Sequence, residues 1–276
     1  MLHATPQHVI DAVNRHLLEL RRQGGRLRIE FESVQTPEAK PDPMRLSNAG
    51  KCPRQMAYQK LIPEKMQELD ARALNVFLLG DLIHDLERGL ISVVAPLTGV
   101  EEQVVLELDN GLAVPGHKDG DLHLKGGPRV LDIKSTATRG FTDMVNNGPR
   151  YDHLCQLNAY MEATDTPKGV LWVYNKDTSH RHAFEVERDD DLLADIKARF
   201  TSVAECESLD RLPLRMYEPM PEMRYKKPTG REYLPWQCTY CPFTEECWTS
   251  EGFVMVFDKG KPRWIKGAPD EEEVEA

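Results

Sequence analysis

Hydrophobic and polar positions alternate in the middle of the chain, where we expect three consecutive strands. The alternation over Val104–Leu108 predicts the first strand, and the Asp-Asn-Gly triplet at 109–111 is a strong hairpin signal. The return strand is expected over Leu112–Leu124 and, after a turn at 125–128, the third over Val130–Lys134. This stretch therefore predicts the part of a β-sheet around which the other elements are arranged.

Apolar residues spaced three or four apart predict helices before and after these strands. The expected helices cover 6–22, 71–94, 151–164 and 189–205. Two apolar runs, 169–174 and 182–186, predict a further hairpin of the sheet, and the glycine-bearing segment 135–148 is expected to be a loop. This order of elements predicts an α/β fold, with a mixed central sheet flanked by helices in a single domain.

Length and composition fit this prediction. The 276 residues are enough to bury a substantial core, and contents of 40% hydrophobic and 29% charged residues are ordinary for a soluble globular protein. No apolar run is long enough to span a bilayer, and the N-terminus lacks the apolar core of a signal peptide. We therefore expect a cytoplasmic protein.

The charge pattern bears on nucleic-acid binding. The formal net charge of −10 argues against a broad DNA-coating surface but not against a narrow basic groove, and part of it lies in the acidic segment 266–276, an expected disordered tail. Cations alternate with aromatic rings over 215–236, which suits single-stranded nucleic acid but is also found in proline-rich connectors. The candidate DNA contacts are Arg139 in the expected loop, Tyr225, Lys226, Lys227 and Trp236.

Two charged residues interrupt the short apolar strand at 130–134. Asp132 and Lys134 are two positions apart and project from the same face, and Asp119 lies one hairpin earlier. Neighbouring carboxylates repel unless a hard cation such as Mg²⁺ or Mn²⁺ lies between them, and a lysine beside the cation can position a water molecule. The alternative is a solvated hairpin with a surface ion pair of little energetic value.

Four of the six cysteines have the spacing of a soft-metal site. Cys238 and Cys241 form a CxxC pair, Cys247 follows closely, and Cys52 lies far upstream before a proline that predicts a helix start. Tetrahedral coordination by four thiolates suits zinc or an iron–sulfur cluster, and spacing alone does not choose between them. The two other cysteines, Cys155 and Cys206, are expected on helices as core or surface thiols.

These motifs resemble a known family when read together. Asp119 with Asp132-Ile133-Lys134 resembles the signature of the PD-(D/E)XK nuclease superfamily, and residues 116–120 resemble its RecB-like branch. Gln156 and Tyr160 match the QxxxY element of that branch. Upstream, His84, four residues after Gly80, matches its helix-borne histidine. The resemblance covers 47–248, and the domains expected from it are 1–46, a nuclease domain over 47–265, and the tail 266–276.

The resemblance implies a role for each matched residue. Asp119, Asp132, His84 and the Ile133 carbonyl would hold a catalytic Mg²⁺ or Mn²⁺, and Lys134 would orient the attacking water. Gln156 and Tyr160 would contact DNA or that water. Gly80 is expected to let backbone approach closely beside the histidine. The neighbouring acids Asp81, Asp85 and Glu87 are expected at the surface.

The cysteine pattern resembles the iron–sulfur group within the RecB-like nucleases, which includes CRISPR-associated adaptation exonucleases, AddB-type nucleases and phage relatives. This resemblance implies a 4Fe–4S cluster held by Cys52, Cys238, Cys241 and Cys247, which would join the two ends of the domain. On the residues alone, zinc stays open as the alternative.

The function implied is metal-dependent hydrolysis of DNA, by an exonuclease that prefers single strands and acts in recombination or repair, phage DNA metabolism or CRISPR adaptation. Expected partners are DNA and other recombination or CRISPR adaptation proteins. The alternative is a non-catalytic DNA-binding or adaptor module that keeps the nuclease fold.

Overall fold

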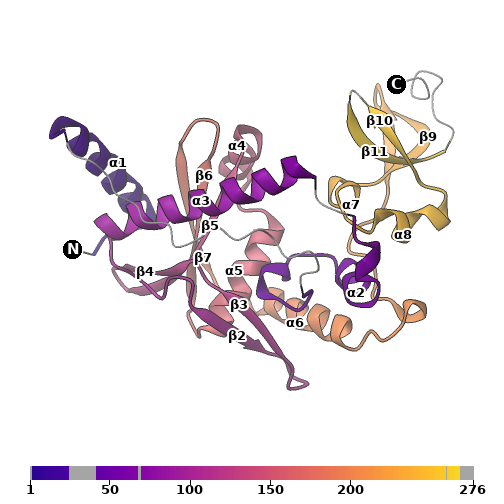
Figure 1. Ribbon diagram of the computed structural model, residues 1–276, viewed down its shortest axis with the longest axis horizontal. Helices are drawn as coiled ribbons and strands as arrows, with labels where there is room; N and C mark the ends of the chain where they lie inside the picture. The colour runs from indigo at the N-terminus through magenta and orange to yellow at the C-terminus, as the bar shows by residue number, and fades with distance from the viewer. Residues whose placement is uncertain (1, 25–41, 68–69, 259, 268–276) are drawn as a thin grey trace. The chain divides into compact units, whose positions relative to one another are not determined.

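The computed structural model describes residues 2–24, 42–67, 70–258 and 260–267 (Figure 1). The chain divides into two compact units, which are described separately. Unit 1 consists of Met1–Lys51 and Leu69–Thr201, and unit 2 consists of Cys52–Glu68 and Ser202–Ala276. The predicted domain bounds at 46/47 and 265/266 stay predictions, and most of the predicted acidic tail, 268–276, lies outside the described residues.

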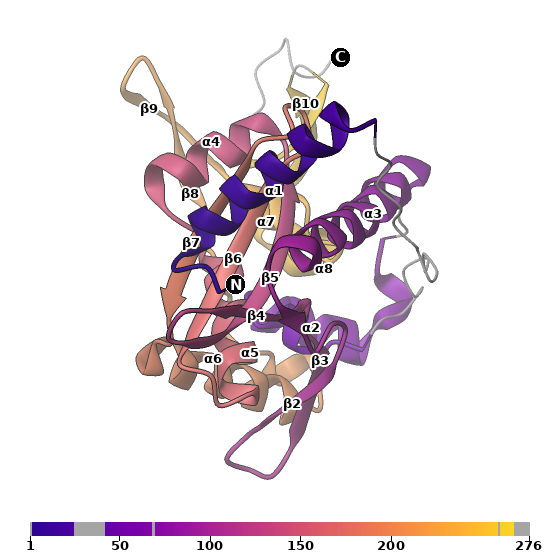
Figure 2. The same ribbon diagram turned by 90° about the vertical axis from the view of Figure 1, so that its left-hand side faces the viewer.

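Unit 1 is built on a mixed sheet of five strands in the order β1-β4-β5-β6-β7. Only the central pair β5–β6 is parallel, and the other neighbours are antiparallel. Strands β2 and β3 form a separate antiparallel pair (Figures 1 and 2). The strands are β1 (Leu97–Thr98), β2 (Gln103–Glu107), β3 (Ala113–His117), β4 (Gly120–Leu124), β5 (Gly127–Thr136), β6 (Lys168–Asn175) and β7 (Arg181–Glu187).

Helices cover this sheet, so the predicted mixed sheet flanked by helices is confirmed. The helices are α1 (Pro6–Arg22), the 3-10 turn η1 (Leu46–Asn48), α3 (Ala71–Val94), α4 (Thr138–Asn147), α5 (Tyr151–Ala163) and α6 (Asp190–Ala204). Apolar residues of α1 and α3 pack with Leu131 and Ile133 of β5 and with Val170 and Trp172 of β6. The main core therefore lies between α1, α3 and one face of the sheet.

Helix caps explain several of the observed boundaries. The Thr5 hydroxyl caps α1 by accepting from the His8 N–H, and the Asp70 carboxylate caps α3 by accepting from the Ala73 N–H at 2.7 Å. Asp189 does the same for α6 by accepting from the Leu192 N–H at 3.0 Å. These caps agree with the predicted helices, whose first residues follow a polar residue in each case.

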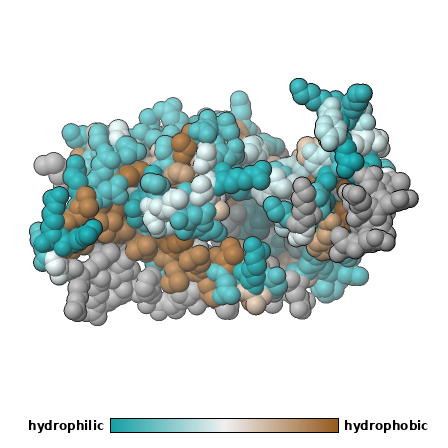
Figure 3. Space-filling model, turned by 90° about the horizontal axis from the view of Figure 1, so that it is seen from above, coloured by the Kyte–Doolittle hydropathy of each residue, from teal (hydrophilic) through white to brown (hydrophobic). Residues whose placement is uncertain are grey.

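Helix α3 is apolar on more than one side. Its second half is fixed to the core by Ile83, Leu90 and Ile91. Its first half exposes apolar side chains, and a hydrophobic area is visible on the face drawn in Figure 3. These exposed side chains are Val76, Phe77, Leu79 and Leu82. The firmly packed half is the one that carries His84.

The predicted return strand over 112–124 is wrong as a single strand. The structure has two strands there, β3 in the small pair and β4 in the main sheet, with Asp119 between them rather than on a strand. Gly120 has a φ of +152°, and a Cβ at this position would lie 2.9 Å from Leu97 Cδ1. Gly120 thus permits the chain to change direction between β3 and β4, which the alternation of polar and apolar residues did not indicate.

The predicted loop over 135–148 is also wrong, because Thr138–Asn147 forms α4. Its first turn is capped from another element, since the Thr138 N–H donates to Asp177 Oδ2 at 2.7 Å. Met144 is buried and anchors the helix to unit 1. The capping residue lies 39 residues downstream, so the sequence around the helix does not indicate this cap.

Unit 2 contains an antiparallel sheet of four strands in the order β10-β11-β9-β8, which was not predicted. Its elements are α2 (Pro53–Leu61), η2 (Pro63–Lys65), η3 (Leu209–Arg211), β8 (Met220–Arg224), β9 (Lys227–Tyr233), α7 (Trp236–Thr239), α8 (Thr244–Trp248), η4 (Thr249–Glu251), β10 (Val254–Asp258) and β11 (Lys261–Lys266). Its core contains Leu234, Cys238, Trp248, Phe253 and Trp264.

Within unit 2, the upstream helix α2 packs on the C-terminal segment. The Tyr58 hydroxyl donates to the Glu246 carbonyl at 3.2 Å, and its ring stacks on Phe243 with 5.7 Å between centroids. Arg54 Nε donates to the Pro213 carbonyl at 2.8 Å. Two segments that are far apart in sequence therefore form one unit.

In the parts of the chain that the structure describes, no helix is long and apolar enough to cross a membrane.

Candidate active site and cysteine centre

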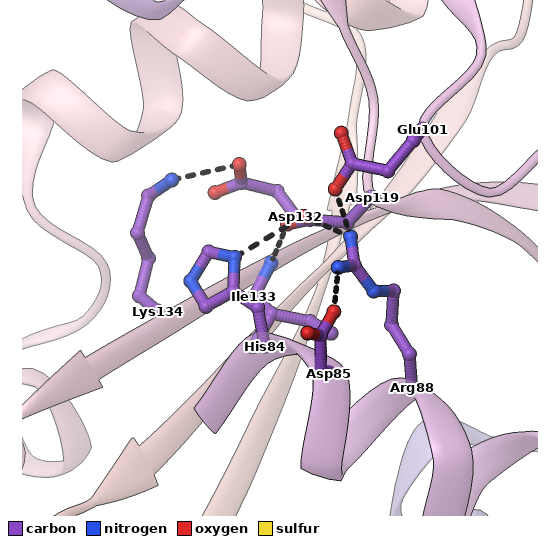
Figure 4. A network of polar contacts seen from close by, with 8 residues as sticks. All are labelled: His84, Asp85, Arg88, Glu101, Asp119, Asp132, Ile133 and Lys134. Atoms are coloured by element: carbon purple, nitrogen blue, oxygen red, sulfur yellow. Dashed lines mark hydrogen bonds and ion pairs between the residues drawn. The ribbon is translucent and has the colours of Figure 1, made fainter. Parts of the chain in front are cut away.

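The central strand β5 presents the first half of the candidate site. Asp132 is 2% exposed, and its Oδ1 accepts from Lys134 Nζ at 2.8 Å (Figure 4). Its other oxygen, Oδ2, is buried and has no hydrogen-bond partner among the described residues. A buried carboxylate oxygen without a partner is costly, so this atom lacks the proton donor or cation that would balance it.

Asp119 approaches Asp132 from the break between β3 and β4. Its Oδ2 accepts from the Ile133 backbone N–H at 2.6 Å, which ties the break to β5. Its Oδ1 lies 3.2 Å from Nδ1 of His84, which the packed half of α3 brings to the site. The structure therefore places His84, Asp119, Asp132 and Lys134 together, as expected, although their roles stay predictions (Figure 4).

Arg88 is a site residue that the sequence reasoning missed. Its guanidinium contacts Asp119 at 3.4 Å and forms close ion pairs with Asp85 and Glu101. Asp85, which was expected at the surface, is half-buried and paired with Arg88. Arg88 lies four residues after His84, so helical spacing from the histidine would have pointed to it.

The two carboxylates have opposite pKa shifts. Burial, reinforced by the charge of Asp119, raises the pKa of Asp132 above its ordinary value despite Lys134. For Asp119, burial is outweighed by His84, Lys134 and the Ile133 N–H, which together lower its pKa to about 2. The Asp119 carboxylate in turn overcomes burial and raises the pKa of His84. Asp119 is thus the firmly ionised member of the pair.

Helix α5 adds Tyr160 and Gln156. Tyr160 is buried and hydrogen-bonded to Gln156, and burial together with the charge of Asp132 raises the pKa of its hydroxyl. Its ring lies close to Gly116, where a Cβ would come within 3.0 Å of Tyr160 Cε1 and 2.7 Å of Leu46. The close packing of Tyr160 and Leu46 against residue 116 therefore requires a glycine at this position.

Another α5 residue, His153, was not predicted. Its Nδ1 is buried and has no hydrogen-bond partner in the described part of the chain, and burial, with a contribution from Lys134, lowers its pKa to about 4. The side chain is therefore neutral at ordinary pH.

Two expectations about α3 are wrong. Among the described residues, a Cβ at Gly80 would have no neighbour within 4 Å, so none of them makes the close approach expected at this glycine. Glu87 is fully buried rather than at the surface: its Oε2 accepts from Trp172 Nε1 at 2.9 Å and from Arg181 Nε at 2.7 Å. Its second oxygen accepts from the same guanidinium at 2.8 Å. Glu87 is a buried anchor between α3 and the sheet.

The donor chemistry at Asp132 fits a divalent cation, although the side chains are not in a coordinating arrangement. Among the described residues, no group of three or more His, Cys, Asp or Glu side chains is arranged to hold a metal ion. Asp132 Oδ1 is instead paired with Lys134, and Asp119 with His84 and Arg88. The unpartnered Oδ2 of Asp132, next to an ionised carboxylate, is the type of oxygen that Mg²⁺ or Mn²⁺ binds.

In unit 2, the four predicted cysteines lie near one another. Burial and the charges of Cys241, Cys52 and Cys247 raise the pKa of Cys238 to about 12. Cys52 is the N-cap of α2, with Pro53 following it as predicted. Thr244 fixes the CxxC turn, because its buried hydroxyl donates to the carbonyl of Cys241 at 2.8 Å.

Arg215 was not predicted to contact this centre. Its Nε donates to Cys247 Sγ at 3.4 Å, and its guanidinium lies 3.8 Å from the centroid of the Trp248 ring. Four thiols and a neighbouring cation have the donor chemistry of a soft-metal site, although among the described residues they are not arranged to hold a metal ion, and they do not distinguish zinc from iron.

The remaining predicted residues are two cysteines and the candidate DNA contacts. Cys155 and Cys206 are buried, and Cys155 lies on α5 as predicted, but Cys206 follows the end of α6 rather than lying on it. Arg139 lies on α4, Trp236 begins α7, and Tyr225 and Lys226 form the turn between β8 and β9, with Lys227 at the start of β9. Their predicted contacts with DNA stay predictions.

Comparison with known proteins gives distant likenesses. A scan against models of protein families finds no match, and neither does a search of curated proteins. The chain is similar to the crystal structure of SSO0001, with 16% identity, a TM-score of 0.49 and coverage of 88% of this chain and 95% of that one.

Two further solved structures to which the chain is similar are described as exonucleases. One is an alkaline exonuclease (LHK-Exo) from Laribacter hongkongensis, with 18% identity, a TM-score of 0.42 and coverage of 60% of this chain and 86% of that one. The other is a phage related exonuclease from Haemophilus somnus 129PT, with 16% identity, a TM-score of 0.33 and coverage of 62% and 86%. With every TM-score below 0.5, these likenesses alone assign neither a family nor a function.

Proposed function

We propose that the chain is a metal-dependent DNA nuclease whose active site is the carboxylate group of unit 1. The observation that carries the proposal is the buried, unpartnered Oδ2 of Asp132, beside the ionised Asp119 and the Lys134 ammonium. Asp132 and Lys134 on one face of the central strand β5, with Asp119 beside them, form a donor set for phosphodiester hydrolysis.

Asp119, Asp132 and the Ile133 carbonyl would hold the cation, with His84 as a further ligand. When bound, Mg²⁺ or Mn²⁺ would polarise the scissile phosphate and lower the pKa of a bound water. Lys134 would leave its ion pair with Asp132 and direct its N–H groups toward the attacking water and the developing charge on the phosphate. Arg88 would keep Asp119 oriented through their contact at 3.4 Å.

Tyr160 and Gln156 would bind the substrate or the water. Burial keeps the Tyr160 hydroxyl protonated, so it can donate a hydrogen bond to a phosphate oxygen. An exonuclease that prefers single strands is the form of this activity that the motif resemblance favours. Its setting, whether recombination, phage DNA metabolism or CRISPR adaptation, and its protein partners stay predictions from that resemblance.

The test is cleavage of end-labelled single- and double-stranded DNA with Mg²⁺, Mn²⁺ or EDTA. The wild type is expected to cleave only with a divalent cation, and Lys134→Ala to lose activity by roughly 10²–10³-fold, the effect of removing one group that stabilises the transition state. Lys168→Ala is the matched control, because Lys168 is the first residue of the neighbouring strand β6 and pairs there with the exposed Glu187.

Folded wild-type protein that cleaves no DNA with any cation would contradict the nuclease. The alternative, a non-catalytic adaptor module, would then be favoured. It predicts that Lys134→Ala leaves the function of the protein intact.

We further propose that Cys52, Cys238, Cys241 and Cys247 hold a 4Fe–4S cluster with a structural role. The support is the convergence of four thiols in one unit and the Arg215 N–H donated to Cys247. Such a cluster would join α2 to the C-terminal segment. Colour separates it from zinc, because an iron–sulfur protein is brown with broad visible absorption, whereas a zinc protein is colourless.

A further inference from the structure

The turn between β8 and β9 has a backbone conformation that its residues rarely adopt. Arg224 and Lys227 are paired across the hairpin, so Tyr225 and Lys226 form a two-residue loop. Both loop residues have positive φ, +51° for Tyr225 and +65° for Lys226. Two positive φ values characterise a type I′ turn, which is normally made by Asn and Gly. A bulky tyrosine in this region is strained, and such strain is found where function requires it.

The base of the hairpin is held firmly below this turn. Glu222 on β8 accepts from Arg231 Nε on β9 at 2.7 Å and from Arg263 Nη2 on β11 at 3.1 Å. The same carboxylate accepts from the Thr229 hydroxyl at 3.0 Å. These contacts tie β8, β9 and β11 together, so the turn projects from a fixed support (Figure 2). The acid nearest to the turn on β8 is thereby already engaged.

The turn presents a ring and positive charge to solvent. Tyr225 is 94% exposed, the largest exposed fraction among the large apolar and aromatic side chains of the described residues. Lys226 and Lys227 are exposed and make no ion pair with any described residue, and Arg224 is exposed beside them. No acid lies between 223 and 228. In a chain of net charge −10, this local excess of cations selects for a polyanion.

We propose that the β8–β9 turn, residues 224–227, is a contact site for single-stranded nucleic acid. Tyr225 would stack on one base, while Lys226 and Lys227 would neutralise the flanking phosphates. An exposed ring among cations fits this ligand, because every base has a face for stacking and every linkage carries a charge. A duplex offers phosphates but hides its base faces. The proposal deepens the proposed function by giving the DNA a second point of contact in unit 2, and it rests on that function only for the choice of DNA.

The binding test uses the full chain in EDTA, so that no cleavage takes place and the result does not depend on nuclease activity. Fluorescence anisotropy would measure binding of a labelled single-stranded oligonucleotide and of its duplex over a range of salt concentrations. The variants are Tyr225→Asn, Tyr225→Phe and the double change Lys226→Gln/Lys227→Gln. The control is Lys261→Gln, an exposed lysine beside the other hairpin turn of the same sheet.

Tyr225→Asn separates stacking from folding, because asparagine adopts positive φ more readily than tyrosine and the variant should fold at least as well. We expect it to weaken single-strand binding about tenfold, within the range for one stacked base. Tyr225→Phe should bind within about twofold of the wild type, since it keeps the ring. The double lysine change should reduce the slope of log K against log salt by roughly 1.4, or about 0.7 for each phosphate contact.

Wild-type affinity and salt slope in both Tyr225→Asn and the double lysine variant would overturn the proposal. So would a loss of equal size in Lys261→Gln, which would indicate a general charge effect. If the turn variants weaken binding of poly-glutamate but not of the oligonucleotide, the turn recognises an acidic protein segment and the nucleic-acid assignment is wrong. Absence of cleavage in a separate assay with Mg²⁺ would count against the proposed nuclease alone.

Discussion

In unit 1 the candidate ligands stand on or beside the central strand β5, whereas in unit 2 the thiols stand on short elements. Asp132 lies on β5, which pairs with β4 and β6, and Asp119 is held by the Ile133 N–H, His84 and Arg88. Cys238 and Cys247 lie on α7 and α8, which contain four and five residues, and Cys52 is only a helix cap. Helices this short are not stable by themselves.

This difference indicates two relations between metal and fold. The carboxylate site is held together by contacts of the protein itself, so its residues should stay together without the proposed cation, although Lys134 would leave its ion pair with Asp132 when a cation binds. The cysteine centre depends on groups whose local structure is weak, so the metal should contribute to the folding of unit 2. The predictions that follow test this contrast, from the largest expected effect to the smallest.

Replacing a cysteine of the centre should have the largest effect. Cys238→Ala should abolish bound iron and visible absorption and lower the unfolding temperature by roughly 10 °C, since several kcal/mol are lost at about 2–4 °C per kcal/mol. Metal analysis and calorimetry would measure this. Cys206→Ala is the control, a buried thiol of unit 2 outside the centre, and it should keep its metal. Full metal content in Cys238→Ala would disprove the four-thiol site.

Breaking the buried ion pair of unit 1 should destabilise the fold without involving any metal. Glu87→Ala leaves Arg181 and the Trp172 indole without their shared acceptor in the core, and the expected loss is about 3–5 kcal/mol in the free energy of unfolding. Urea denaturation would measure it. Glu187→Ala, which breaks an exposed pair with Lys168, should leave the midpoint unchanged. Equal losses in both variants would show that burial does not explain the effect.

The buried His153 should make stability depend on pH. Its pKa is lowered from 6.5 to about 4, so between these values the unfolded chain binds a proton that the folded chain does not. Stability is therefore fully present above pH 6.5 and falls as the pH decreases toward 4, by on the order of 2 kcal/mol after allowance for partial exposure. Denaturation of wild type and His153→Gln at a series of pH values would test this. Identical pH profiles would contradict it.

The smallest expected effect concerns Tyr160. Tyr160→Phe removes one hydroxyl but keeps the ring that packs near Gly116, so stability should hardly change. We expect the rate of DNA cleavage to fall on the order of tenfold, the value of about one hydrogen bond. Single-turnover kinetics would measure the rate. A large loss of stability with an unchanged rate would make Tyr160 a packing residue.

Local patterns predicted the parts of this site that depend on one element. The spacing of two between Asp132 and Lys134 defines a face of a strand, and the register of His84 follows from the helical pattern of α3. Asp119 was placed near them correctly but on the wrong element, because the break before Gly120 depends on a glycine at φ +152° inside an apparently continuous strand.

The missed features depend on long-range contacts or on unusual residues. Helix α4 begins at a cap supplied by Asp177, and Arg215 reaches Cys247 from 32 residues away. The β8–β9 hairpin has no Asn-Gly or Asp-Gly at its turn, so the common hairpin signal was missing. Because glutamate is usually found at the surface, the sequence did not indicate that Glu87 is buried. Its burial is explained by its partner Arg181, 94 residues downstream.

The central claim is that the unpartnered carboxylate oxygen on β5 is a ligand for a divalent cation. Titration with Mn²⁺, followed by the electron paramagnetic resonance signal of the free ion, would test it without reference to activity. The wild type should bind Mn²⁺, Asp132→Asn should bind at least about tenfold more weakly, and Asp143→Asn, an exposed change on α4, should bind like the wild type. Equal Mn²⁺ affinity in wild type and Asp132→Asn would contradict the account.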